Sequence, residues 1–170
     1  MSLKRWTSKW PESEVPTGTF KGLIEDKEIL SRLGTICYMW PHVEAQITRV
    51  FADLIGGFDS PAIASQVSMA IISQQLRIKV MQTLLENGRQ NRNKSQKYDH
   101  ILEEFGKANA LRNSYIHGLW TTHQSGRTFL ESVSADGFGW CRARRVTAKE
   151  LDNYIARLMK LHELILNRNV

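Results

Sequence analysis

The sequence has little proline and cysteine and no long hydrophobic run. Its 170 residues include 4 prolines, 11 glycines and 2 cysteines, which excludes collagen-like and low-complexity sequence. No stretch approaches the roughly 20 apolar residues of a membrane helix, and the first residues contain no apolar segment typical of a secretory signal. We therefore expect a cytoplasmic protein that does not enter a membrane. Cys37 and Cys141 are expected to be free thiols, and they form no metal-binding pattern.

The remaining composition is that of an ordinary folded domain with a basic excess. Apolar residues make up 42% of the chain and charged residues 24%, a balance that argues against wholesale disorder. The 23 Lys and Arg residues exceed the 17 Asp and Glu residues and give a net charge of +6. Such an excess favours an anionic partner, and nucleic acid is the first candidate.

Apolar residues recur every three or four positions along most of the chain, which predicts a mainly helical fold. We expect an N-terminal arm at 1–24 and a helical domain at 25–170. The predicted helices run from about 25 to 54, 60 to 86, 96 to 117 and 147 to 167. Pro41 makes the first either one kinked helix or two helices end to end. Ser60 is the predicted cap of the second, whose wide apolar arc places it at the centre of a bundle. A polar loop is expected at 89–97.

The apolar period changes between the third and the last helix. Short strands are predicted at 119–123, 127–133 and 138–146, with turn residues at 124–126 and 135–137. Thr147 and Glu150 then match a capping box at the start of the last helix. The predicted fold class is therefore mainly α: a bundle of four to five helices with a small β-hairpin or meander inserted at about 119–146.

Arg112 does not fit the face of the helix on which it lies. It follows Phe105 by seven residues and Ala108 by four, so it continues the inward apolar stripe. A charge placed there is costly unless it is paired or functional. His117 ends the same helix, about 140° around it from Arg112. The two side chains converge if the last turn loosens, as Gly118 permits.

Ordinary helix chemistry explains these residues as well. An arginine near a helix C-terminus can donate to the last carbonyls, and a histidine there interacts favourably with the helix dipole. The spacing alone favours this structural explanation over a functional one.

The stretch ALRNSYIHG at 110–118 resembles the signature of the HEPN superfamily (higher eukaryotes and prokaryotes nucleotide-binding). That signature is an Arg, four to six residues of which the first is usually polar, and a His. Here Arg112 is followed by Asn113 and, after four residues in all, by His117. The order of elements over about 25–168 is similar too. The resemblance implies a HEPN-like bundle in which two subunits bring their motifs to one cleft. Many such proteins are metal-independent ribonucleases that act as toxins or phage-defence effectors.

The resemblance also implies catalytic roles for Arg112, Asn113 and His117. An RNA 2′-hydroxyl can attack the adjacent phosphate when a base takes its proton and an acid protonates the leaving oxygen. His117 can do either near neutral pH. Arg112 can hold the phosphate oxygens, and Asn113 can orient His117 or donate to the phosphate. This reaction needs no metal and no other cofactor. The implied partners are RNA, a second copy of the chain and a cognate antitoxin protein.

Basic residues gather in two stretches that suit an RNA backbone. From Arg77 to Lys97 the chain holds six basic residues and one acidic residue. Such groups would make RNA binding depend on salt, although a solvated loop and a charged edge strand explain them equally well. The residues expected to contact RNA are Arg89, Arg92, Lys94, Arg142, Arg144 and Arg145.

Two other functions stay open from the sequence. The first is a HEPN-like module that binds nucleotides or a partner protein without catalysis. The second is a DNA-binding regulator, because helices followed by a hairpin imitate a winged helix. The long first and second helices fit that small fold poorly.

Overall fold

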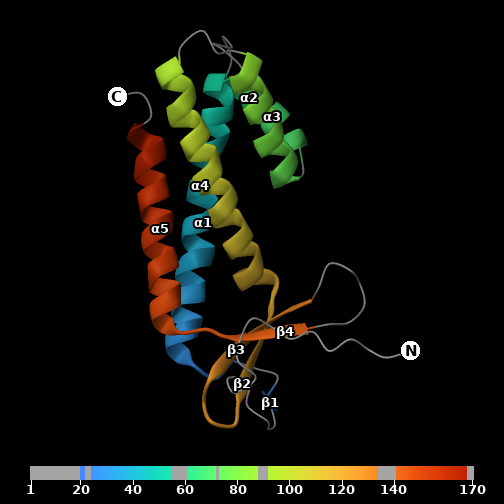
Figure 1. The fold of residues 1–170 in the computed structure, drawn as a ribbon, viewed down its shortest axis with the longest axis vertical. Helices are drawn as coiled ribbons and strands as arrows, with labels where there is room; N and C mark the ends of the chain where they lie inside the picture. Colours follow the sequence, from blue (N-terminus) through green and yellow to red (C-terminus); the bar gives the residue numbers. More distant parts are fainter. Residues whose placement is uncertain are drawn as a thin grey trace, which may run out of the picture. The chain divides into compact units, whose positions relative to one another are not determined.

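Helices dominate the structure, and four strands form one small sheet (Figure 1). The structure, a computed structural model, describes residues 20–21, 24–54, 61–71, 73–87, 92–133 and 141–167. Its helices there are α1 (Lys27–Leu54), α2 (Pro61–Ala70), α3 (Gln74–Asn87), α4 (Arg92–His117) and α5 (Ala148–Leu166). The strands are β1 (Phe20–Lys21), β2 (Leu119–His123), β3 (Thr128–Val133) and β4 (Cys141–Arg145). The predicted fold class, a mainly helical fold with a small antiparallel sheet before the last helix, is confirmed.

Backbone contacts divide the chain into two compact units. The first, the sheet unit, contains the described residues up to Gly34 together with Asn113–Asp152. It therefore holds all four strands, the start of α1, the end of α4 and the start of α5. The second, the bundle unit, contains the described residues of Thr35–Arg112 and of Asn153–Val170.

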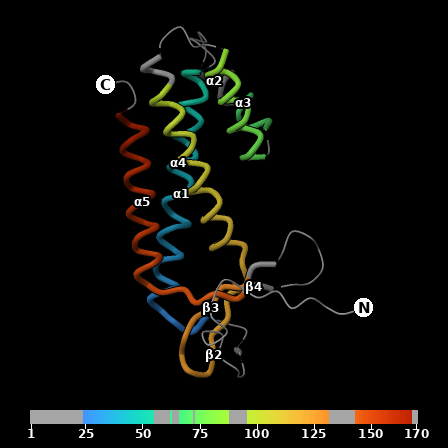
Figure 2. The backbone as a smooth tube through the Cα atoms, in the orientation of Figure 1, coloured from blue at the N-terminus to red at the C-terminus, as the bar shows by residue number. Residues whose placement is uncertain are grey.

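The interior of the bundle unit is formed by α1, α3, α4 and α5, whose paths can be followed in Figure 2. Trp40 of α1 stacks on Phe105 of α4, with ring centroids 5.5 Å apart. On the α5 side, the Tyr154 hydroxyl donates to the Ala108 carbonyl at 2.8 Å. The inward residues predicted for the third helix are all buried: Tyr98, Ile101, Leu102, Phe105 and Ala108.

The first helix, α1, is a single helix that passes through Pro41. Asp26 caps its start, because the Asp26 Oδ1 accepts hydrogen bonds from the backbone N–H groups of Glu28 and Ile29 at 2.9 and 3.2 Å. These bonds satisfy donors that have no partner within the helix. Of the two arrangements that the sequence left open, the structure has the single helix, since the apolar stripe keeps its phase across the proline.

The predicted second helix is two helices, so a single helix over 60–86 was wrong. Ser73 starts α3, because its Oγ accepts from the Leu76 N–H at 3.3 Å. Arg77, four residues after Ser73, donates from its Nε to the Ile71 carbonyl at 2.8 Å. These polar contacts separate α2 from α3, and an apolar period does not reveal them. The predicted cap at Ser60 lies outside the described residues.

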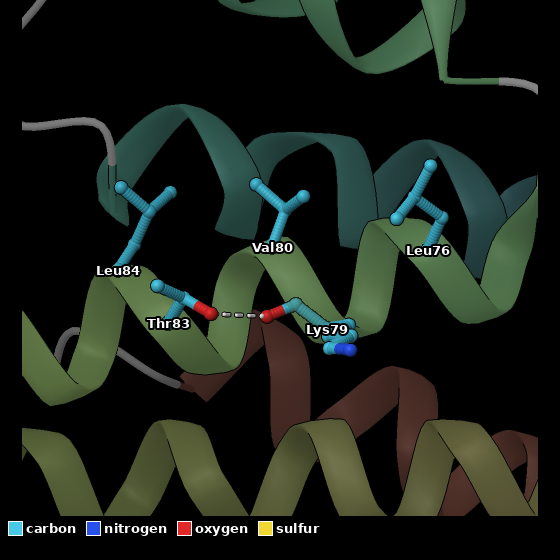
Figure 3. A pocket seen from close by; sticks show the side chains of 5 residues that line it. All are labelled: Leu76, Lys79, Val80, Thr83 and Leu84. Carbon is cyan, nitrogen blue, oxygen red and sulfur yellow. Dashed lines mark hydrogen bonds between the residues drawn. The ribbon is translucent and has the colours of Figure 1, made fainter.

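One apolar face of α2 and α3 is at the surface, and not at the centre of the bundle as predicted. Met69 is 67% exposed and Leu76 is 51% exposed, whereas Met81 and Leu85 are buried. Figure 3 shows Leu76, Val80 and Leu84 pointing to the same side of α3. With Lys79 and Thr83, these three residues line an open groove of about 300 Å³.

The helix α4 begins earlier than predicted, at Arg92. Most of the expected polar loop is therefore helical, while residues 88–91 lie outside the described part. Arginine, lysine and glutamine are good helix formers, so this stretch can be helical without an apolar period. Lys97 Nζ donates to the Asn167 carbonyl at 2.6 Å, which satisfies an acceptor at the end of α5.

The sheet is antiparallel throughout, with strand order β1-β2-β3-β4. The strands predicted at 119–123, 127–133 and 138–146 correspond to β2, β3 and β4, and residues 138–140 lie outside the described residues. Gly126, in the first predicted turn, has a φ of 77°, which favours glycine. The second predicted turn, at 135–137, lies outside the described residues.

The fourth strand comes from the predicted N-terminal arm. In β1, Phe20 pairs with His123 of β2 and Lys21 with Thr122. Residues 1–19 and 22–23 of that arm lie outside the described part of the chain. The sheet is therefore larger than a hairpin or a three-stranded meander, because a segment distant in sequence completes it.

Candidate functional site

The three predicted catalytic residues lie near the C-terminal end of α4. His117 is the last residue of that helix. The division between the two units falls between Arg112 and Asn113. Arg112 thus belongs to the bundle unit, whereas Asn113 and His117 belong to the sheet unit. Arg112 is half-buried, and Asn113 and His117 are exposed.

Arg112 is placed by an aromatic side chain of the bundle. Its guanidinium carbon lies 5.7 Å from the centroid of the Trp40 ring, and Trp40 itself is buried against Phe105. A cation over an indole ring is attracted by about 0.5–2 kcal/mol. This contact agrees with the prediction that Arg112 continues the inward stripe, and it explains how the helix accommodates a charge there.

The last turn of α4 is regular, so the loosening that Gly118 was expected to permit is not present there. The Gly118 N–H donates to the Ser114 carbonyl at 3.0 Å, the spacing of an α-helix. A Cβ on residue 118 would collide with Leu130 Cδ1 of β3 and with the Ser114 carbonyl oxygen. Gly118 therefore allows the close approach of the helix end to the sheet, and it does not unwind the helix.

Tyr115 anchors this last turn inside the sheet unit. Its side chain is buried, and its hydroxyl donates to Glu150 Oε1 of α5 at 2.8 Å. Its carbonyl, one of the last four of the helix, accepts from Trp120 Nε1 at 2.7 Å. Such carbonyls have no partner within the helix. Side chains from β2 and α5 thus hold the residue that lies two positions before His117.

Arg144 belongs to the same network and not to a free basic surface. Its guanidinium forms an ion pair with Glu150 and lies 5.5 Å from the centroid of the Tyr115 ring. Burial alone would lower the pKa of Arg144, but the hydrogen bonds with Glu150 and Tyr115 raise it above the ordinary value. Burial, together with the bond to Glu150, raises the pKa of Tyr115 to about 12. At neutral pH the network therefore holds a neutral phenol and a cationic guanidinium.

Of the other residues predicted to contact RNA, the structure describes the side chain of Arg145. Arg145 is exposed on β4. Lys94 precedes Arg112 by eighteen residues on α4, which is about 27 Å along a helix axis. The start of α4 therefore does not extend the surface around Arg112. Arg89 lies outside the described residues, and so do the side chains of Arg92, Lys94 and Arg142.

Sequence reasoning missed the residues that hold the motif in place. Trp40 and Trp120 were not assigned to the site, and Glu150 was predicted only as a capping residue. The cap is present, since the Glu150 N–H donates to Thr147 Oγ1 at 3.2 Å. The carboxylate, however, accepts from Tyr115 and Arg144. A tyrosine inside the motif was the one available signal that the helix end is anchored.

The described ranges contain no cluster of side chains suited to binding a metal ion. No group of three or more His, Cys, Asp or Glu residues is placed there to hold a metal ion. Cys37 is a free thiol, as predicted, and its side chain is exposed. His123 is buried, and its Nδ1 accepts from the Ser125 N–H at 3.1 Å, so it shapes the turn after β2. None of the helices in the described ranges is long and apolar enough to cross a membrane.

Comparisons of the chain with protein-family models, with curated proteins and with solved structures found no match. The resemblance to the HEPN superfamily therefore rests on the residues at 110–118 and on the order of the elements.

Proposed function

We propose that this protein is an endoribonuclease of the HEPN type, which acts without a metal and as a homodimer. The observation that carries the proposal is the sequence Arg112-Asn113-x3-His117 at the C-terminal end of α4. A role as a toxin or a defence effector in the cytoplasm, held in check by a cognate antitoxin protein, belongs to the same proposal.

The exposure and support of these residues favour a reaction on a large substrate. Asn113 and His117 are open to solvent, so an RNA strand can reach them. Arg112 is held against Trp40, which limits the conformations of a long side chain before any substrate binds. Preorganised charges stabilise a transition state better than mobile ones, because they need little reorganisation.

The proposed reaction is a transfer of the phosphate within the RNA. A base removes the proton of the 2′-hydroxyl, and the 2′-oxygen forms a bond to phosphorus. The bond from phosphorus to the 5′-oxygen breaks, and an acid protonates that oxygen. The products are a 2′,3′-cyclic phosphate and a 5′-hydroxyl. His117 serves as the base or the acid, Arg112 neutralises the phosphate oxygens, and Asn113 orients His117 or donates to the phosphate.

A second copy of the chain supplies the other half of the proposed site. The reaction uses both a base and an acid, and the motif contains a single histidine. Two motifs that face one cleft provide both groups and two arginines. The net charge of +6 favours the approach of the polyanionic substrate.

The proposal is tested by incubating the purified protein with mixed RNA in EDTA. The variants are Arg112→Ala and His117→Ala, and His100→Ala, an exposed histidine on the same helix, is the matched control. We expect the wild type and the control to leave 2′,3′-cyclic phosphate and 5′-hydroxyl ends. Both motif variants should lose at least about a hundredfold in rate, because His117→Ala removes acid–base catalysis and Arg112→Ala removes charge stabilisation of the transition state. Circular dichroism checks that each variant folds.

Each other result points to a different function. If neither the wild type nor any variant cuts RNA, a HEPN-like module that binds without catalysis becomes the favoured function. If all four proteins cut equally, the activity belongs to another site or to a contaminant. Binding of duplex DNA that is lost in Arg145→Ala and kept in Arg112→Ala would favour the DNA-binding regulator.

A further inference from the structure

We propose that Tyr115 and Glu150 are positioning residues that fix the direction of His117 from inside the protein. The proposal rests on the proposed function, because it assigns both residues to that reaction. It adds residues that do not themselves touch the substrate.

The geometry of the last turn of α4 links Tyr115 to His117. Tyr115 and His117 are two positions apart, which on a helix places their side chains about 200° apart. Tyr115 is accordingly buried, whereas His117 is exposed. Any rotation or unwinding of this turn moves both side chains together. An anchor on the buried side therefore sets the direction of the exposed imidazole.

The anchor acts where helices are ordinarily loosest. Helix ends fray over their last turn because the final carbonyls have no helical partner. Here the Tyr115 carbonyl accepts from Trp120 of β2 at 2.7 Å, and the Tyr115 hydroxyl donates to Glu150 of α5 at 2.8 Å. Two different elements of the sheet unit thus hold one residue, by its backbone and by its side chain.

The acceptor of the hydroxyl is itself fixed. The Glu150 backbone N–H donates to Thr147 Oγ1 at 3.2 Å, which ties this residue to the start of α5. Arg144 forms an ion pair with the same carboxylate oxygen that Tyr115 bonds. Charge-assisted hydrogen bonds are short and strong. The bond from Arg144 therefore holds the Glu150 oxygen in position to accept from Tyr115.

The bundle unit offers a matched control for this hydrogen bond. Tyr154 is 3% exposed and Tyr115 is 2% exposed. The Tyr154 hydroxyl donates to the Ala108 carbonyl at 2.8 Å, the same length as the bond of Tyr115. Tyr154→Phe therefore removes a hydrogen bond of the same length, made to a neutral carbonyl, and Ala108 lies outside the last turn of α4.

The experiment compares Tyr115→Phe and Tyr154→Phe by RNA cleavage and by amide hydrogen exchange. Exchange is followed at Gly118, whose N–H bonds the Ser114 carbonyl in the last turn. For Tyr115→Phe we expect kcat to fall about ten- to hundredfold, the effect of a small misplacement of a catalytic group, with KM little changed. The Gly118 amide should exchange faster as well. Tyr154→Phe should leave kcat and Gly118 exchange at the wild-type values.

A conservative variant separates positioning from a general loss of structure. Glu150→Gln keeps an acceptor oxygen for Tyr115, so it should retain more of kcat than Glu150→Ala. Equal kcat losses in Tyr115→Phe and Tyr154→Phe would overturn the positioning role, as would an unchanged kcat in Tyr115→Phe. If the wild type itself cleaves no RNA, the proposed function fails and the positioning role with it. Gly118 exchange then still reports whether Tyr115 anchors the helix end.

Discussion

The Tyr115 hydroxyl donates to Glu150 Oε1 at 2.8 Å and thereby joins the last turn of α4 to the first turn of α5. The same carboxylate binds Arg144. A phenol can share an acceptor with a guanidinium in this way only while it keeps its proton. The bond therefore makes the stability of the sheet unit depend on the protonation of one tyrosine.

Alkaline pH should reveal this dependence. The pKa of Tyr115 is raised to about 12, whereas an unfolded tyrosine titrates near 10. Because the folded state holds the proton more tightly, the contribution is complete below pH 10 and is lost as the pH rises towards 12. Tyr115→Phe should lower the free energy of unfolding at pH 8 by about 1 kcal/mol. Its denaturant midpoint should then fall less between pH 10 and 12 than that of the wild type.

Tyrosine and lysine side chains ordinarily titrate near pH 10, so the difference between the two proteins is the informative quantity. Tyr154→Phe supplies the control of equal bond length. Parallel curves for the wild type and Tyr115→Phe from pH 9 to 12 would show that Tyr115 does not titrate as proposed.

Two glycines should respond in opposite ways to the same substitution. A Cβ at residue 118 would collide with Leu130 of β3 and with the Ser114 carbonyl, so Gly118→Ala should destabilise the protein by about 1–3 kcal/mol. At Gly34, within α1, a Cβ meets nothing within 4 Å. Gly34→Ala should stabilise the protein by about 0.5–1 kcal/mol, because alanine is the better helix former. Chemical denaturation of both variants checks the pair, and a neutral Gly118→Ala would contradict the close packing.

Local patterns were enough to predict α1, α5, the buried face of α4 and the strands that follow the motif. The inward stripe of α4 predicted its buried residues because one period runs through the helix, from Tyr98 to Ala108. Turn residues at 124–126 predicted the connection of β2 and β3. The position of Arg112 on that stripe is likewise a local property, and its contact with Trp40 agrees with it.

Side-chain hydrogen bonds and contacts between distant residues could not be predicted in this way. The break between α2 and α3 depends on Ser73 and Arg77 bonding backbone groups, and β1 pairs with a strand about a hundred residues later. The partners of Tyr115 lie on β2, β4 and α5. No period in the sequence encodes such pairings, so the anchoring of the motif became visible only in the structure.

Arg144 and Arg145 are neighbours with different expected roles. Arg144 pairs with Glu150, so Arg144→Ala should cost about 1–3 kcal/mol of stability by removing the partner of a half-buried carboxylate. Arg145 is exposed, and Arg145→Ala should change stability by less than about 0.5 kcal/mol. If Arg145 contacts an RNA phosphate, Arg145→Ala should make the slope of log binding constant against log salt concentration shallower by about one. Thermal unfolding and RNA binding at several salt concentrations test both. Equal stability of the two variants would contradict the structural role of Arg144.

Arg112→Lys asks whether the proposed reaction needs the shape of the guanidinium or only its charge. A lysine keeps the positive charge and can still lie over the Trp40 ring, so the variant should fold like the wild type. It lacks the planar fork that binds two phosphate oxygens at once. We therefore expect single-turnover cleavage to slow about ten- to hundredfold, which corresponds to losing part of the charge stabilisation in the transition state. Arg112→Ala should be slower still, since it loses the charge as well. A fully active Arg112→Lys would mean that a point charge suffices and that the bidentate contact proposed for Arg112 is not made.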